Sequence, residues 1–264
     1  MARPFLFGTN FKMNQTPAES AAFYRQLAAA IQIPPDTHLF VIPPFTSLSA
    51  VNDVGGQPPH KIWVGAQNVH WAPSGAYTGE ISVSMLLALE VDLVLLGHAE
   101  RRRDYHETDD ELNRKVLAVL GAGLRVLLAV GETAQERSFS VGGETVLRQL
   151  KIGLHGVESG HLNLLQIAYE PVWSIGAGGT PARPGDVEPI ASVIRSGCRD
   201  LFGEPGNEIP ILYGGSVDPS NAGTFTALPD IDGLFVGRAA WTVEGFIATY
   251  EAGIRGWKGG RVTG

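Results

Sequence analysis

Eight short runs of apolar and β-branched residues recur along this chain at intervals of roughly 30 residues, the length of one βαβ unit, and this period restricts the fold more than any other feature. The runs lie at residues 5–8, 39–42, 62–65, 93–96, 126–130, 165–168, 211–213 and 234–236. Strands without polar alternation are buried on both faces, which is typical of a parallel sheet that is covered by helices.

Segments with the apolar spacing of amphipathic helices separate these runs. Thr16 and Glu19 form a capping-box pattern around Pro17, so the first helix is expected to begin there. The expected helices cover residues 18–31, 110–120, 145–154, 187–201 and 243–250. Eight strand-and-helix units in 264 residues fit a closed (β/α)8 barrel better than an open doubly wound sheet, because no remainder is left for a second domain. We therefore expect a single α/β barrel domain over residues 1–264.

Composition and charge exclude several other classes of protein. Hydrophobic residues make up 44% of the chain, which is incompatible with intrinsic disorder. No stretch reaches the roughly 18 apolar residues of a membrane span, and the first residues contain no signal-peptide core. The net charge of -7, without a basic stripe, argues against a nucleic-acid partner, and the single Cys198 excludes an internal disulfide or a Cys-x-x-Cys site. We expect a soluble, cytoplasmic protein.

Three ionisable residues follow strands whose carboxyl ends would meet on the catalytic face of a barrel. Lys12 follows the first strand, His98 the fourth and Glu170 the sixth. Taken alone, the lysine is also compatible with a solvated surface charge and the histidine with a structural role. The functional interpretation is stronger for Glu170, because its apolar neighbours would desolvate the carboxylate and raise its pKa, as a general base requires.

Glycine-rich turns follow the seventh and eighth strands, at Gly214-Gly215-Ser216 and at Gly237-Arg238. Two such turns side by side allow backbone N–H groups to converge on a phosphate. Residues 174–181 have the small residues and flanking prolines of a hinged lid. No metal or nucleotide motif is present. The remaining histidines have no ligand spacing and are expected to be structural or on the surface: His38, His60, His70, His106, His155 and His161.

Five motifs together resemble the triosephosphate isomerase family. They are NFKMN from Asn10, GHAERR from Gly97, AYEPVWSIG from Ala168, YGGSV from Tyr213 and DGLFVGR from Asp232. They occur in the family's order and cover nearly the whole chain. The resemblance implies a cofactor-independent aldose-ketose isomerase that interconverts dihydroxyacetone phosphate and glyceraldehyde 3-phosphate through an enediolate, a step shared by glycolysis and gluconeogenesis.

The resemblance also implies a role for each motif residue. Glu170 is the base, His98 the electrophile and Lys12 a source of positive charge. The implied catalytic set is Lys12, His98, Glu170, Asn10 and Glu100, and the implied phosphate-binding positions are Gly176, Ser216, Gly237 and Arg238. No metal and no cofactor are implied, and the substrate is a small phosphorylated sugar.

The sequence departs from the family pattern at a few positions. Ala99 stands where the family has serine and Ala129 where it has cysteine, and both changes look tolerable. The lid lacks the family's lysine and gains Pro181. Arg238 replaces the second glycine after the eighth strand, where its guanidinium could bind phosphate in bidentate fashion, reduce the space for it, or turn away and present only its N–H.

The segment from Gln67 to Glu80, Arg238 after the eighth strand and the Gly-x-Pro-Ala ending of the lid together also resemble a bacterial branch of the family that isomerises erythrulose phosphate in erythritol breakdown. The alternative substrate is therefore a four-carbon tetrulose phosphate. A third alternative is a catalytically silent barrel that binds sugar phosphate, which intact Lys12, His98 and Glu170 disfavour. The apolar loop around Trp71 and Tyr77, together with the resemblance, predicts a homodimer in which Tyr77 and Thr78 are buried.

Overall fold

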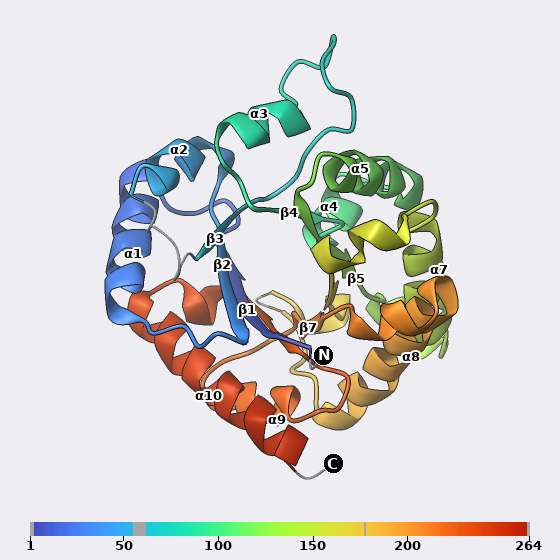
Figure 1. Cartoon of the computed structure of the whole chain (residues 1–264). Coiled ribbons are helices and arrows are strands. Elements are labelled where there is room, and N and C mark those ends of the chain that lie inside the picture. The colour runs from blue at the N-terminus through green and yellow to red at the C-terminus, as the bar shows by residue number, and fades with distance from the viewer. Residues whose placement is uncertain (1–2, 55–61, 177, 263–264) are drawn as a thin grey trace.

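A computed structural model describes residues 3–54, 62–176 and 178–262 of the chain. Eight parallel strands form a closed barrel in the order of the sequence, and β8 pairs with β1 to complete it (Figure 1). The strands are β1 (Phe5–Asn10), β2 (Thr37–Ile42), β3 (Trp63–Ala66), β4 (Leu93–Leu96), β5 (Arg125–Val130), β6 (Leu165–Tyr169), β7 (Ile211–Tyr213) and β8 (Gly233–Val236). The predicted (β/α)8 barrel is confirmed.

Helices surround the barrel as a ring, and the segment between β3 and α3 projects outward from that ring (Figure 1). The α-helices are α1 (Pro17–Ala30), α2 (Leu48–Asn52), α3 (Val83–Ala88), α4 (Ala99–Asp104), α5 (Asp109–Gly121), α6 (Ala134–Ser138), α7 (Gly142–Gly153), α8 (Pro184–Phe202), α9 (Ala222–Thr226) and α10 (Val243–Val262). Short 3-10 turns lie at η1 (Phe45–Ser47), η2 (Ser159–Leu164), η3 (Val172–Ser174), η4 (Glu204–Glu208) and η5 (Arg238–Ala240). None of the described helices has both the length and the apolar character that a membrane span requires.

The last helix differs most from its predicted extent. We expected a helix over residues 243–250, whereas α10 continues to Val262. The glycines after residue 250 lower intrinsic helix propensity, which is why the predicted helix ended at that residue. Gly256 instead lets α10 approach α9 closely, since a Cβ there would lie 2.1 Å from the carbonyl oxygen of Gly223. Close packing against α9 therefore overrides the local preference.

The five helices that sequence periodicity did not predict are α2, α3, α4, α6 and α9. Each has only five or six residues, which is too short to show a 3.6-residue period. At the start of α1, by contrast, the predicted capping box is confirmed, because Thr16 and Glu19 exchange side-chain and backbone hydrogen bonds.

Two apolar layers hold the barrel together. An outer layer lies between the strands and the helices, and an inner layer fills the barrel with side chains such as Leu6, Phe40, Leu95, Leu127 and Leu212. Because the inner layer is packed, the barrel is not a pore. Phe235 of β8 belongs to this inner layer and also lines the cavity at the carboxyl ends of the strands.

Candidate active site

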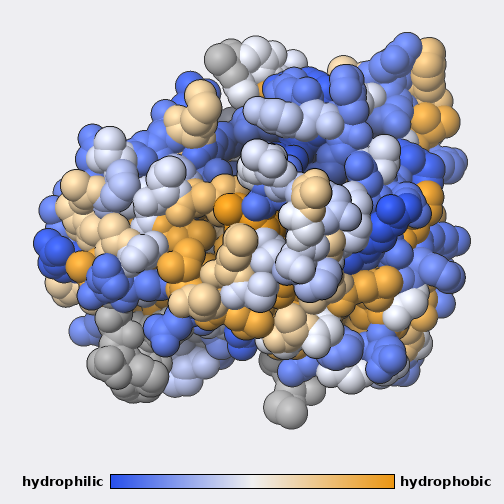
Figure 2. All heavy atoms as spheres, turned by 90° about the horizontal axis from the view of Figure 1, so that it is seen from above, coloured by the Kyte–Doolittle hydropathy of each residue, from blue (hydrophilic) through white to orange (hydrophobic). Residues whose placement is uncertain are grey.

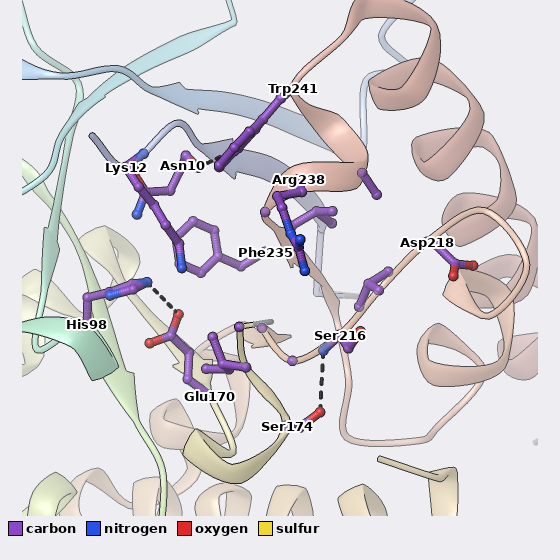
Figure 3. Close-up of a pocket in the computed structure, with 18 residues that line it drawn as sticks. Asn10, Lys12, His98, Glu170, Ser174, Ser216, Asp218, Phe235, Arg238 and Trp241 are labelled. Atoms are coloured by element: carbon purple, nitrogen blue, oxygen red, sulfur yellow. Dashed lines mark hydrogen bonds and ion pairs between the residues drawn. The ribbon is translucent and has the colours of Figure 1, made fainter. Parts of the chain in front are cut away.

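A cavity of about 510 Å³ opens at the carboxyl ends of the strands. Eight of the nine predicted site residues line it, namely Asn10, Lys12, His98, Glu170, Gly176, Ser216, Gly237 and Arg238. Glu100 is not part of the lining, but its carboxylate contacts Lys12 at 2.6 Å. Residues separated by more than 200 positions in the sequence thus converge on one space (Figure 3).

Glu170 follows β6 directly and is only 3% exposed. Its Oε2 accepts the backbone N–H of Ala99 at 3.1 Å, and its Oε1 lies 3.4 Å from Nε2 of His98 (Figure 3). Gly131 allows this placement, since a Cβ there would lie 1.9 Å from the Glu170 carbonyl oxygen. A buried carboxylate with a single short donor retains an oxygen that can take up a proton.

His98 follows β4 and forms the N-cap of α4. Its Nδ1 accepts the backbone N–H of Glu100 at 3.2 Å. A ring nitrogen that accepts from an N–H carries no proton, so the neutral ring holds its proton on Nε2. This nitrogen is the one near Glu170, and His98 can therefore donate a hydrogen bond to a substrate oxygen placed in the cavity.

Lys12 is held by contacts at both its backbone and its side chain. Its φ of 54° is unusual for a residue with a side chain. The Asn10 Oδ1 accepts the Lys12 N–H at 2.8 Å, and the Gln67 Nε2 donates to the Lys12 carbonyl at 2.7 Å. The Lys12 Nζ donates to Glu100 Oε1 at 2.6 Å. These contacts keep the ammonium group on the side of the cavity where His98 and Glu170 lie (Figure 3).

The turns after β7 and β8 form the other end of the cavity. The Ser216 N–H points to Ser174 Oγ at 3.5 Å, a distance that leaves the N–H available to a better acceptor. Burial raises the pKa of Tyr213, next to this turn, to about 12, so the phenol stays neutral in this part of the molecule. Gly237 lines the cavity at the start of η5.

Arg238 is exposed, and its guanidinium extends into the cavity toward the side where Ser216 lies (Figure 3). Of the orientations left open by the sequence, the side chain does not turn away. Within the described part of the chain, the guanidinium has neither a hydrogen bond nor an ion pair. It is therefore a cation in the cavity that is available to an anion.

The predicted lid begins at the end of η3. Trp173 anchors this segment, because its Nε1 donates to the buried Glu132 at 2.6 Å and its carbonyl accepts the Thr180 N–H at 3.0 Å. Gly176 has a φ of 86°, a conformation that suits glycine. Ala177 lies outside the described residues.

The cavity lining also includes residues that sequence reasoning did not assign to the site, among them Phe235, Asp218 and Trp241. Phe235 belongs to the DGLFVGR motif, and Trp241 lies in the run that begins at Gly237, so their position after or within the eighth strand was a usable signal. The directions of these side chains could not be predicted from the sequence, because they depend on how β8 meets β1.

The structure also bears on the other histidines. His70 is buried and its Nδ1 accepts the Ala72 N–H at 3.0 Å, while His38 stacks on Trp63 at 4.5 Å. His106, His155 and His161 lie partly or fully on the surface, and His60 is outside the described residues. No three His, Cys, Asp or Glu side chains gather as a metal site in the described ranges.

Comparisons with known proteins indicate one family of isomerases, whose members carry two different substrate names. The family model for triosephosphate isomerase matches residues 5–253. Over 243 residues the chain is 44% identical to the L-erythrulose-1-phosphate isomerase of Rhizobium etli, covering 91% of this chain and 89% of that protein. Over 256 residues it is 41% identical to the triosephosphate isomerase of Carboxydothermus hydrogenoformans, covering 96% of this chain and 100% of that protein. It is 40% identical over 248 residues to the triosephosphate isomerase of Syntrophotalea carbinolica, covering 94% and 97%.

Proposed function

The chain belongs to the triosephosphate isomerase family of sugar-phosphate isomerases, and from this premise we propose that it interconverts dihydroxyacetone phosphate and glyceraldehyde 3-phosphate. The observation that carries the proposal is the 3.4 Å approach of Glu170 Oε1 to His98 Nε2 in a cavity that also contains Lys12. A base, a neutral hydrogen-bond donor and a cation are the groups that proton transfer beside a carbonyl requires. We treat residues 1–264 as one domain in this proposal.

The reaction begins with proton removal by Glu170. The carboxylate takes the proton from the carbon next to the carbonyl, and the C–H electron pair becomes the enediolate double bond. His98 donates its Nε2 proton to the developing oxygen and moves protons between the two oxygens. Lys12 offsets the negative charge on those oxygens, at a distance set by its contact with Glu100. Glu170 then returns the proton to the neighbouring carbon, which completes the isomerisation.

The substrate phosphate occupies the opposite end of the cavity in this proposal. The backbone N–H groups at Ser216, Gly237 and Gly176 donate to its oxygens, and Arg238 adds a charge-assisted contact. Closure of residues 174–181 over the phosphate excludes water, which limits loss of phosphate from the enediolate. The mechanism uses no cofactor.

The second candidate function is the same proton transfer on erythrulose 1-phosphate. Two observations favour it: the relative from Rhizobium etli carries that name, and Arg238 extends into the phosphate end of the cavity. The carbonyl and hydroxyl that face Glu170 and His98 are the same in both sugars. In erythrulose 1-phosphate the extra carbon lies on the side of the carbonyl away from the phosphate, so discrimination must come from the side chains that surround that carbon.

An assay of the purified protein on both sugar phosphates, side by side, tests these candidates. We expect the larger kcat/KM on the triose. A larger value on the tetrulose assigns the second function, and no turnover of either assigns the silent sugar-phosphate-binding barrel.

Assembly as a homodimer is also part of the proposal. The loop between β3 and α3 projects from the barrel, and Tyr77 in it is 47% exposed, with Met85 and Leu87 exposed on α3 (Figure 1). Figure 2 looks onto this side of the molecule and shows hydrophobic residues gathered across its middle. A monomer seldom leaves so much apolar surface in water. We propose that Tyr77 and Thr78 are buried beside the active site of a second copy; sedimentation of a fully active monomer at micromolar concentration would contradict this.

A further inference from the structure

The short helix α4 contacts or carries all three ionisable groups of the cavity. His98 is the N-cap residue of this helix. The N–H of Ala99, the first residue of α4, donates to Glu170 Oε2 at 3.1 Å. The carboxylate of Glu100, the second residue, accepts the Lys12 Nζ at 2.6 Å. A small movement of α4 would therefore displace the imidazole, the carboxylate and the ammonium group together.

Apolar packing holds α4 only weakly. The helix has six residues, of which Ala99 is the buried one, and a single methyl group contributes little burial energy. A helix of this length is unstable on its own and takes its position from tertiary contacts. Polar contacts must therefore fix α4 against the barrel.

Arg102 of α4 supplies three such contacts. Its Nε donates to the Gly97 carbonyl oxygen at 2.8 Å, and its Nη2 donates to the Ala129 carbonyl oxygen at 3.1 Å. Its Nη1 donates to Asp109 Oδ1 at 2.6 Å. The guanidinium thus joins the carboxyl ends of β4 and β5 to the first residue of α5.

Gly97 gives this guanidinium the space that it occupies. The φ of Gly97 is 73°, and a Cβ there would lie 2.9 Å from both the Ala129 carbonyl oxygen and Arg102 Nη2. A side chain at residue 97 would displace the guanidinium or the strand. Because Gly97 directly precedes His98, its contact with Arg102 fixes the chain at the point where the imidazole leaves the barrel.

These three contacts require an arginine. The guanidinium presents several N–H donors in a rigid planar fork, whereas the ammonium group of lysine is a single point charge. Arg148 of α7 provides a comparison, because its Nη1 donates to the other oxygen of Asp109 at 2.7 Å, with its side chain 55% exposed. It shares the carboxylate with Arg102 but is not part of α4.

We propose that Arg102 is a positioning residue for catalysis. It holds α4 against the carboxyl ends of β4 and β5, so that the three catalytic side chains keep the mutual geometry that proton transfer requires. Arg102 does not belong to the cavity lining and acts through the helix. This inference rests on the proposed isomerase function and adds to it a residue outside the cavity wall.

The experiment compares Arg102→Lys with the matched control Arg148→Lys, the same substitution at the other arginine bound to Asp109. Arg102→Lys keeps a positive charge near Asp109 but loses the fork, so kcat should fall by about ten- to hundredfold. KM for the sugar phosphate and the affinity for inorganic phosphate should change by less than about threefold, because the turns after β7 and β8 are not altered. Arg148→Lys should leave all three quantities near those of the wild type, and urea unfolding shows that both variants are folded.

A second measurement does not need turnover. NMR of the ring nitrogens of His98, assigned by their loss in His98→Gln, reports which nitrogen carries the proton. In the wild type we expect an unprotonated Nδ1 and a protonated Nε2, since Nδ1 accepts the Glu100 N–H at 3.2 Å. In Arg102→Lys a displaced α4 weakens this hydrogen bond, so both nitrogen signals should shift toward those of a mixture of tautomers.

Wild-type kcat in folded Arg102→Lys overturns the inference while leaving the isomerase function intact. An equal loss of kcat in Arg148→Lys also overturns it, as does a loss of phosphate affinity as large as the loss of kcat, which would indicate disruption of the whole barrel. If the wild type turns over neither sugar, the proposed function has failed, and the His98 spectrum decides the positioning role. A shift in Arg102→Lys toward mixed tautomers supports that role; an unchanged spectrum overturns it.

Discussion

Two buried carboxylates at opposite ends of the barrel have very different surroundings. Asp232 lies just before β8, is fully buried, and accepts Arg3 Nε at 2.6 Å, Arg195 at 2.6 Å, Arg261 at 2.5 Å and the Ile211 N–H at 3.0 Å. Glu170 follows β6 and has one backbone donor at 3.1 Å and one imidazole at 3.4 Å. The amino end thus neutralises its buried charge, and the carboxyl end leaves its charge able to react.

Two arginines show the same contrast. Arg195 is mostly buried and donates to Asp232 and to the carbonyl oxygens of Asn207 and Ile209. Arg238 extends into the cavity with no partner among the described residues. A guanidinium that is fully paired stabilises the fold, and one that is unpaired is available to a ligand.

Substitution of Glu170, the carboxylate with few hydrogen-bond donors, should have the largest effect on activity. Glu170→Gln keeps the shape of the side chain and removes the basic site, so turnover should fall by roughly 10²–10⁴ while the free energy of unfolding stays near that of the wild type. Steady-state kinetics and urea unfolding measure both. A variant that retains more than about a third of wild-type turnover contradicts the assignment of Glu170 as the base.

Substitution of the fully partnered carboxylate should act on stability instead. Asp232→Asn leaves three guanidinium groups around a neutral amide, and breaking a buried ion pair costs about 3–5 kcal/mol. We expect a loss of this size in urea unfolding, with kcat of the folded enzyme little changed. The matched control is Asp230→Asn, whose partially exposed side chain contacts Arg195 at 3.3 Å. If the control lowers stability as much as Asp232→Asn, the contrast between the two ends does not hold.

Arg238→Gly should lower kcat/KM on the native sugar by about ten- to hundredfold, because it removes a charge-assisted contact to phosphate worth about 1.5–3 kcal/mol. The other sugar should lose less or gain. Arg238→Lys keeps the charge but not the bidentate geometry, so its kcat/KM on the native sugar should lie between those of the wild type and Arg238→Gly. Equal effects of Arg238→Gly on both sugars would show that this arginine has no part in specificity.

The smallest effect concerns His38 at the amino end. Burial, and secondarily the charge of Arg125, lower the pKa of His38 below its usual 6.5. The folded state therefore prefers the neutral ring, so this contribution to stability is present above pH 6.5 and is lost as the pH falls through the lowered pKa. Wild type should lose more unfolding free energy than His38→Gln between pH 7 and about 5. Parallel pH curves for the two proteins would argue against this effect.

The pattern of the sequence predicted elements whose cause is local. The period of apolar runs predicted eight strands and a closed barrel, and the Thr16 and Glu19 pattern predicted the start of α1. The residues after the strand ends predicted that Lys12, His98 and Glu170 share one cavity, although their catalytic roles remain predictions. These features follow from the fold class, because parallel strands in a barrel bring their carboxyl ends to one face.

The tertiary structure alone decided the features that depend on contacts between distant residues. Arg3 and Asp232 are 229 positions apart, and Trp241 and Asn10 are 231 apart, so no local period marks either pair. Closure of β8 against β1 creates both contacts, one at each end of the barrel. The length of α10 has the same origin, since its glycines are unfavourable for a helix alone and favourable where α9 packs closely. Local chemistry specified the strands, the longer helices and the residues that follow the strand ends, whereas side-chain partners and the remaining cavity residues were set by the closing of the barrel.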